Sequence, residues 1–241
     1  MNYRQMKWSV LPLAAMFLLW WFVSAGMHLK SFKENSLEQL AVLASTMQGC
    51  NYMKAQVLFS VIYLVMLYMI LPQARAEHLV RETRSRWILK RIGEMGIGAS
   101  YFAATFVLLQ VIMAIVVLDL SFLQAHQYFV GMFLYWTALL LLYWFLGGIF
   151  LLCNLLVISK LKALALTVLI STVLMAMAFY RYIPTVYLSL DIVQLSIADI
   201  DVFAVFLRPI FWNVPILTGV LYLSRIVFLR KDLMQYENQT F

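Results

Sequence analysis

Long stretches without a charged residue constrain the fold of this chain more than any other feature. Trp8 to Leu29 holds no charge, and 40 uncharged residues separate Asp119 from Lys160. About 20 helical residues cross a bilayer core of about 30 Å. The sequence is 64% hydrophobic and 12% charged, whereas about a quarter of the residues in a soluble domain are charged. These features exclude a soluble globule and a disordered chain, and they predict an all-α polytopic membrane protein.

The uncharged stretches predict six transmembrane helices within a single domain covering 1–241. The 40-residue stretch is too long for one span and too short for two with a turn, so one span is placed within it. The last span is expected to begin at Pro209, because proline is favourable at the first helical position. The six expected spans are 8–29, 55–74, 95–118, 128–158, 163–180 and 209–229.

Lysine and arginine are distributed unequally between the two sides of this layout. Six spans place both termini on one side, and cytoplasmic loops carry an excess of Lys and Arg. Cytoplasmic termini put 13 of the 18 basic residues in the cytoplasm. We therefore predict cytoplasmic N and C termini in a multi-pass protein of the cell membrane. The net charge of +7 marks a membrane side, so no nucleic-acid partner is expected.

Three segments outside the expected spans have recognisable patterns. Within 31–53, Ser36 and Gln39 have capping-box spacing, which predicts a short external helix. Apolar residues recur at roughly helical spacing in 182–207 with aspartates between them, which predicts short helices at the external membrane interface. The segment 73–94 is the only sizeable cytoplasmic loop in this layout.

Few residues in this sequence could carry out chemistry. The three histidines are far apart and on different expected sides, so they lack the ligand spacing of a zinc site, and no metal or cofactor is expected. The motifs H-E-x-x-H, G-x-S-x-G and G-x-x-x-x-G-K-[ST] do not occur. Ionisable groups inside spans are usually functional, and the expected span interiors contain none. We therefore predict neither enzyme activity nor proton-driven transport.

Polar and small residues within the expected spans are interpreted as packing features. Gln110, Asn154 and Asn213 are expected to form interhelical hydrogen bonds of order 1 kcal/mol. Small residues spaced four apart allow close approach of two helices. The expected helix-packing seam consists of Gly96, Ser100 and Ala104.

The cytoplasmic segment VRETRSRWILKRIGEM forms an amphipathic pattern when it is drawn as a helix. Its apolar face comprises Val80, Trp87, Ile88, Ile92 and Met95. The other positions are mostly charged: Arg81, Glu82, Arg84, Arg86, Lys90, Arg91 and Glu94. Such a helix could rest on anionic lipid, or it could dock on a cytoplasmic partner. The glutamates within the basic field favour docking slightly, because a helix that binds only lipid gains nothing from them.

At this segment the sequence resembles type-2 ABC exporter permeases, in particular the small six-span permeases of Gram-positive bacteria that are encoded with a separate ATPase. The resemblance rests on RETRSRWILKR followed directly by IGEMGIGASYFAATF, on six spans with cytoplasmic termini, and on the external amphipathic segment between spans five and six. It implies that the loop is a coupling helix that docks on the ATPase. The coupling residues implied by position are Arg81, Glu82, Arg84, Arg86 and Trp87.

The resemblance implies a permease subunit without catalysis of its own. Its partners would be a cytoplasmic ATP-binding subunit, a second permease copy or a sister permease, and membrane lipids. Its cargo would be a hydrophobic or cationic peptide, a lipid or a drug. The alternative is a membrane-embedded assembly or sensory partner that has no transport path.

Overall fold

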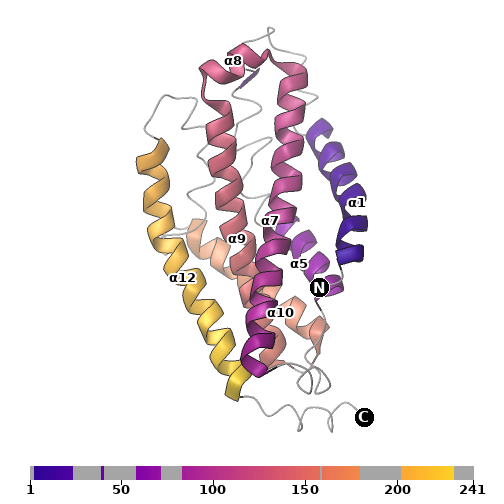
Figure 1. Ribbon diagram of the computed structural model, residues 1–241, viewed down its shortest axis with the longest axis vertical. Coiled ribbons are helices and arrows are strands. Elements are labelled where there is room, and N and C mark those ends of the chain that lie inside the picture. The colour runs from indigo at the N-terminus through magenta and orange to yellow at the C-terminus, as the bar shows by residue number, and fades with distance from the viewer. Residues whose placement is uncertain are drawn as a thin grey trace.

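The computed structural model describes residues 3–23, 39–40, 58–71, 83–157, 159–179 and 202–230 (Figure 1). Within these residues all regular structure is helical, which confirms the all-α class. The helices are α1 (Tyr3–Trp21), α5 (Leu58–Ile70), α7 (Arg84–Val117), α8 (Leu120–Ala125), α9 (Tyr128–Leu156), α10 (Lys160–Phe179) and α12 (Val202–Arg230).

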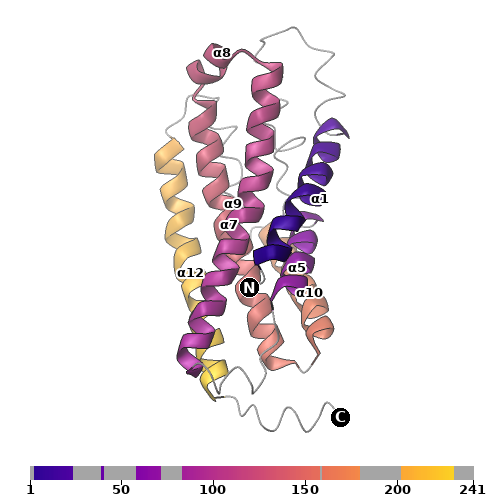
Figure 2. The ribbon, with the colours of Figure 1, turned by 45° about the vertical axis from the view of Figure 1, so that its right-hand side comes forward.

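Helices α7 and α9 form the centre of the bundle and run antiparallel (Figures 1 and 2). The short helix α8 joins them across one end, and Gln127, in the left-handed conformation with φ of 52°, turns the chain into α9. Helix α12 packs along one flank of this pair. Helices α1, α5 and α10 pack against the remaining sides of α7 and α9.

Aromatic rings join three of these helices in the core. The Phe17 side chain of α1 is fully buried, and its ring centroid lies 5.1 Å from that of Phe59 in α5. The same ring lies 5.4 Å from Phe102 and 5.0 Å from Phe106, both in α7. These pairs have the edge-to-face geometry that aromatic rings prefer. The cluster therefore fixes how α1 and α5 lie against α7.

Three helices in the described part of the chain are long and apolar enough to cross a membrane. They are Arg84–Val117, Tyr128–Leu156 and the Asn213–Arg230 part of α12. Two shorter apolar helices, Leu11–Trp21 and Leu58–Ile70, fall within the first two expected spans. By length and composition the described residues thus support a membrane-embedded bundle with three spans, where the sequence predicts six.

Helix α7 begins eleven residues before the expected span 95–118. The end of the expected loop 73–94 is therefore helical and continuous with the span, and no break separates the two. At about 1.5 Å per residue, the 34 residues of α7 extend over about 51 Å. A bilayer core is about 30 Å thick. A helix of this length that crosses a bilayer near the membrane normal extends beyond the hydrocarbon, and the charged residues of α7 lie at its N-terminal end.

The other helix boundaries differ less from the sequence predictions, with one exception. Helix α9 covers Tyr128–Leu156 against the expected 128–158, and α10 begins at Lys160, three residues before the expected 163. The prediction that Pro209 begins the last helix is wrong, because α12 begins at Val202. Proline is tolerated inside membrane helices, where other groups can satisfy the freed carbonyl. The expected external helix 31–53 lies outside the described residues except for 39–40, and 182–207 does so up to residue 201.

Candidate functional site

Basic residues of three helices, α7, α10 and α12, lie at one end of the bundle. The Arg225 Nη2 donates a hydrogen bond to the Ser85 Oγ over 3.4 Å, which joins the end of α12 to the start of α7. The Lys160 Nζ, at the start of α10, donates to the Leu71 carbonyl over 2.6 Å, just beyond the end of α5. We name this region the basic end and define it by its described cationic residues: Arg84, Arg86, Lys90, Arg91, Lys160, Lys162, Arg225 and Arg230.

The five expected coupling residues differ in exposure, and two of them lie outside the described residues. Arg84 and Arg86 are exposed on the first turn of α7. Arg81 and Glu82 lie outside the described residues. Trp87 is only 3% exposed, and its role as a coupling residue stays a prediction. Its ring is covered because it stacks on Phe228 of α12, with centroids 4.8 Å apart and planes inclined by 20°.

Arg91 and Glu94 form a buried ion pair that the amphipathic pattern did not predict. The pattern placed both on the polar face, yet they are 6% and 5% exposed. The Arg91 Nη1 donates to the Glu94 Oε2, one helical turn further along α7. The Arg91 Cζ also lies 5.1 Å from the centroid of the Trp87 ring, within range of a cation–π interaction. Glu94, Arg91, Trp87 and Phe228 thus form a continuous series of contacts from α7 to α12.

Lys160 caps the end of a neighbouring helix. Its ammonium donates to the carbonyls of Tyr68 and Leu71, which belong to the group of carbonyls that a helix end leaves unpaired. The ammonium also lies 4.6 Å from the centroid of the Tyr68 ring. Burial lowers the pKa of Lys160 below that of a free lysine side chain. The residue stands just before the expected span 163–180, and no local motif indicated this contact.

The three residues of the expected seam lie toward α9, where they meet tryptophan rings. A Cβ added to Gly96 would lie 3.0 Å from the Trp144 ring, and the Trp144 Nε1 donates to the Ile92 carbonyl over 3.2 Å. The Trp136 Nε1 lies 3.4 Å from the Ser100 carbonyl, to which it donates. Ala104 lies with Trp136 on the wall of a cavity. The role of this seam in assembly stays a prediction.

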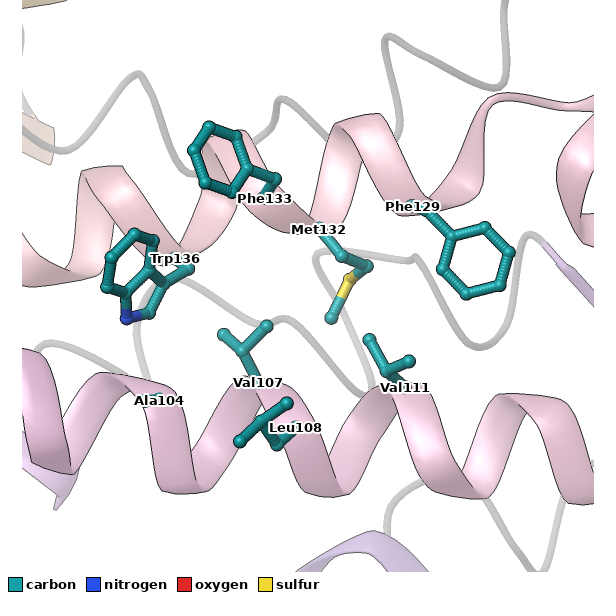
Figure 3. Close-up of a pocket in the computed structure, with 8 residues that line it drawn as sticks. All are labelled: Ala104, Val107, Leu108, Val111, Phe129, Met132, Phe133 and Trp136. Atoms are coloured by element: carbon teal, nitrogen blue, oxygen red, sulfur yellow. The ribbon is translucent and has the colours of Figure 1, made fainter.

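An apolar groove of about 260 Å³ lies between α7 and α9, toward the α8 end (Figure 3). Side chains from the two helices face each other across it. Leu108 and Phe133 are about 60% exposed, so the groove opens on the outside of the bundle. Its lining holds no charged residue and consists of Ala104, Val107, Leu108, Val111, Phe129, Met132, Phe133 and Trp136.

Two amides expected to bond between helices are buried. Gln110 in α7 is 1% exposed and Asn213 in α12 is 2% exposed. The Gln110 Nε2 and the Asn213 Oδ1 have no hydrogen-bond partner among the described residues. Over the same residues, no three His, Cys, Asp or Glu side chains lie close enough to hold a metal ion. Among the described residues, the basic end and the groove are therefore the two candidate functional sites.

Comparison with known proteins yields no relative: no family, no curated protein and no solved structure matches this chain.

Proposed function

We propose that this chain is the membrane-spanning permease subunit of an ABC exporter, driven by a separate cytoplasmic ATP-binding subunit. One observation carries the proposal: α7 is a single helix that leads from the basic end to the wall of the apolar groove. A continuous helix transmits displacement along its axis without an intervening hinge. Work done by a partner at one end of α7 can therefore reach the groove.

The basic end has the position and exposure that a docking surface for the ATP-binding subunit needs. Residues 84–94 add about 16 Å to α7 before the uncharged part begins, at about 1.5 Å per residue. Arg84 and Arg86 are exposed there. Arginine pairs well with carboxylates in protein interfaces, so the complementary partner surface is acidic.

The groove suits a hydrophobic cargo, such as a lipid, a drug or an apolar peptide side chain. It lies within the uncharged parts of α7 and α9 and opens sideways, where bilayer hydrocarbon would surround it. No charged residue stands between Asp119 and Lys160 or between Glu94 and Asp119. Transport coupled to protons usually needs an ionisable site within the membrane, so an external source of work is the better supported alternative.

The described helices are compatible with six spans and cytoplasmic termini. Helix α5 ends beside the start of α10, and α12 ends beside the start of α7. All four of these helix ends therefore lie at the basic end of the bundle. Cytoplasmic segments of membrane proteins carry an excess of Lys and Arg. We therefore propose that the basic end is cytoplasmic in a bacterial cell membrane and that the α8 end is external.

Thiol labelling tests this orientation. We expect a membrane-impermeant maleimide to label the native Cys50 in intact cells, because the segment 31–53 is assigned outside. A cysteine at Arg86, introduced with Cys50→Ser, should react only after permeabilisation. Arg86 is chosen because it is exposed, whereas the neighbouring Ser85 is half-buried against Arg225. Cys153 is 3% exposed and should contribute little background. Labelling of Arg86→Cys in sealed cells would reverse the orientation.

Affinity purification from native membranes tests the function itself. The tagged chain in mild detergent should retain an ATP-binding subunit and a second permease, either another copy or a sister chain. Proteoliposomes of this complex should move a hydrophobic cationic dye only with ATP. A chain that purifies without an ATP-binding subunit, and whose vesicles show no response to ATP, would favour the alternative of an assembly or sensory partner.

A further inference from the structure

Arg91 belongs to the basic end, but Arg91 and Glu94 are both buried, so the ion pair that they form is not exposed for docking. We propose that Arg91 and Glu94 are positioning residues that hold the Trp87 ring against Phe228, and thereby fix the basic end of α7 on the end of α12. The effect on transport rests on the proposed function. The contact between the two helices does not.

Each contact in the series restricts the next. Glu94 holds the Arg91 guanidinium through a charge-assisted hydrogen bond. The guanidinium lies 5.1 Å from the Trp87 ring centroid, and that ring stacks on Phe228 at 4.8 Å. The Trp87 Nε1 has no hydrogen-bond partner among the described residues. The ring itself, and not its N–H group, is therefore what joins α7 to α12.

The buried Arg91–Glu94 pair is expected to fix the positions of neighbouring side chains more than it stabilises the fold. Removing two charges from water is unfavourable, so a buried pair is often no more stabilising than apolar residues of the same volume. Removal of one partner is different, because it leaves an uncompensated buried charge. A change at Glu94 should therefore turn Arg91 toward water and away from Trp87.

The orientation of α7 where it contacts α12 also affects the groove. Ala104 lies ten residues beyond Glu94, about 15 Å along the same helix. A tilt of the basic end relative to α12 therefore shifts the groove wall that α7 provides. We name the contacts of Glu94, Arg91, Trp87 and Phe228 the α7–α12 junction.

Distance measurements between spin labels test the junction without any partner protein. Labels replace Leu89 and Leu229, which are exposed near the junction on α7 and α12, in the full chain with Cys50→Ser and Cys153→Ser. We expect a narrow distance distribution for this parent, a broad one with Glu94→Gln, and a width between the two with Glu94→Asp. An unchanged distribution with Glu94→Gln would overturn the role of the ion pair.

A second pair of variants keeps the test decisive if Glu94→Gln does not fold. Trp87→Phe retains a ring and should keep the narrow distribution, whereas Trp87→Ala should broaden it. Equal widths in these two variants would overturn the role of the ring.

Trp87→Ala should also lower ATP-dependent transport roughly tenfold, a coupling effect of ordinary size, while ATP hydrolysis continues. Broadening without any ATP-driven transport in the parent complex would retain the junction and refute the proposed function.

Discussion

We expect Gly96→Leu to lower the stability of the bundle by about 1–3 kcal/mol, the usual cost of overpacking a well-filled site. A Cβ at this position would already lie 3.0 Å from the Trp144 Cε2 and 3.1 Å from its Cζ2. The Trp144 ring is held by its hydrogen bond to the Ile92 carbonyl. It can move away only by losing that bond. The measurement is the thermal midpoint and the fraction of monodisperse protein in mild detergent.

Gly93→Leu is the matched control, one helical turn earlier on α7. Among the described residues, no atom beyond its chain neighbours and its own helix backbone lies within 4 Å of a Cβ placed there. Leucine also has a higher helix propensity than glycine, by about 0.8 kcal/mol. We therefore expect Gly93→Leu to be neutral or slightly stabilising. Equal losses in the two variants would show that the Trp144 contact does not limit the approach of α9 to α7.

The sequence predicts the position of α9 well because a long uncharged stretch is a strong local signal. Helix α9 was expected at 128–158 and covers Tyr128–Leu156. The sequence places the start of the span at residue 95 because charge indicates where the hydrocarbon ends, and the amphipathic helix expected before it is continuous with the span in the structure. Residues 84–94 are charged, yet they extend the same helix. The prediction for Pro209 is wrong because proline is favourable at a helix start but is also tolerated within a membrane helix.

The sequence of α7 alone does not predict which of its faces is buried. An amphipathic pattern assigns Arg91 and Glu94 to water, because both are charged. In the structure they are 6% and 5% exposed, close to Trp87 where it stacks on Phe228 of α12. More than 130 residues separate Trp87 from Phe228 in the sequence. Nothing local to either residue indicates that contact, and the cap that Lys160 provides for α5 is hidden for the same reason.

The groove likewise depends on the register between two helices. Ala104, Val107 and Leu108 are ordinary span residues in the sequence, as are Phe129 and Phe133. Only the antiparallel packing of α7 and α9 brings them to one cavity. The expected seam residue Ala104 borders this groove, so a packing signal in the sequence proved to lie beside a candidate site.

Charge reversal in the expected coupling segment should have the largest effect on partner binding. Under the proposed function, we expect Glu82→Lys to reduce co-purification of the proposed ATP-binding subunit and to uncouple ATP hydrolysis from transport. A misplaced like charge in a protein interface can cost several kcal/mol. Arg84→Glu should act in the same direction, because a docking surface responds to the position of each charge. Arg84 is exposed on the first turn of α7, so its loss should not disturb the core. Both variants are compared after their insertion and folding have been verified in detergent.

Lipid binding gives opposite expectations for the same two variants. A helix held by anionic lipid depends on summed positive charge, with about 1 kcal/mol for each Lys or Arg near the surface. Glu82→Lys would then strengthen attachment or leave it unchanged, and Arg84→Glu would weaken it. If Glu82→Lys keeps the ATP-binding subunit while Arg84→Glu releases a peptide of this segment from anionic vesicles, the basic end is a membrane anchor. The projection of α7 beyond the bilayer would then no longer favour a transporter subunit over a non-transporting membrane partner.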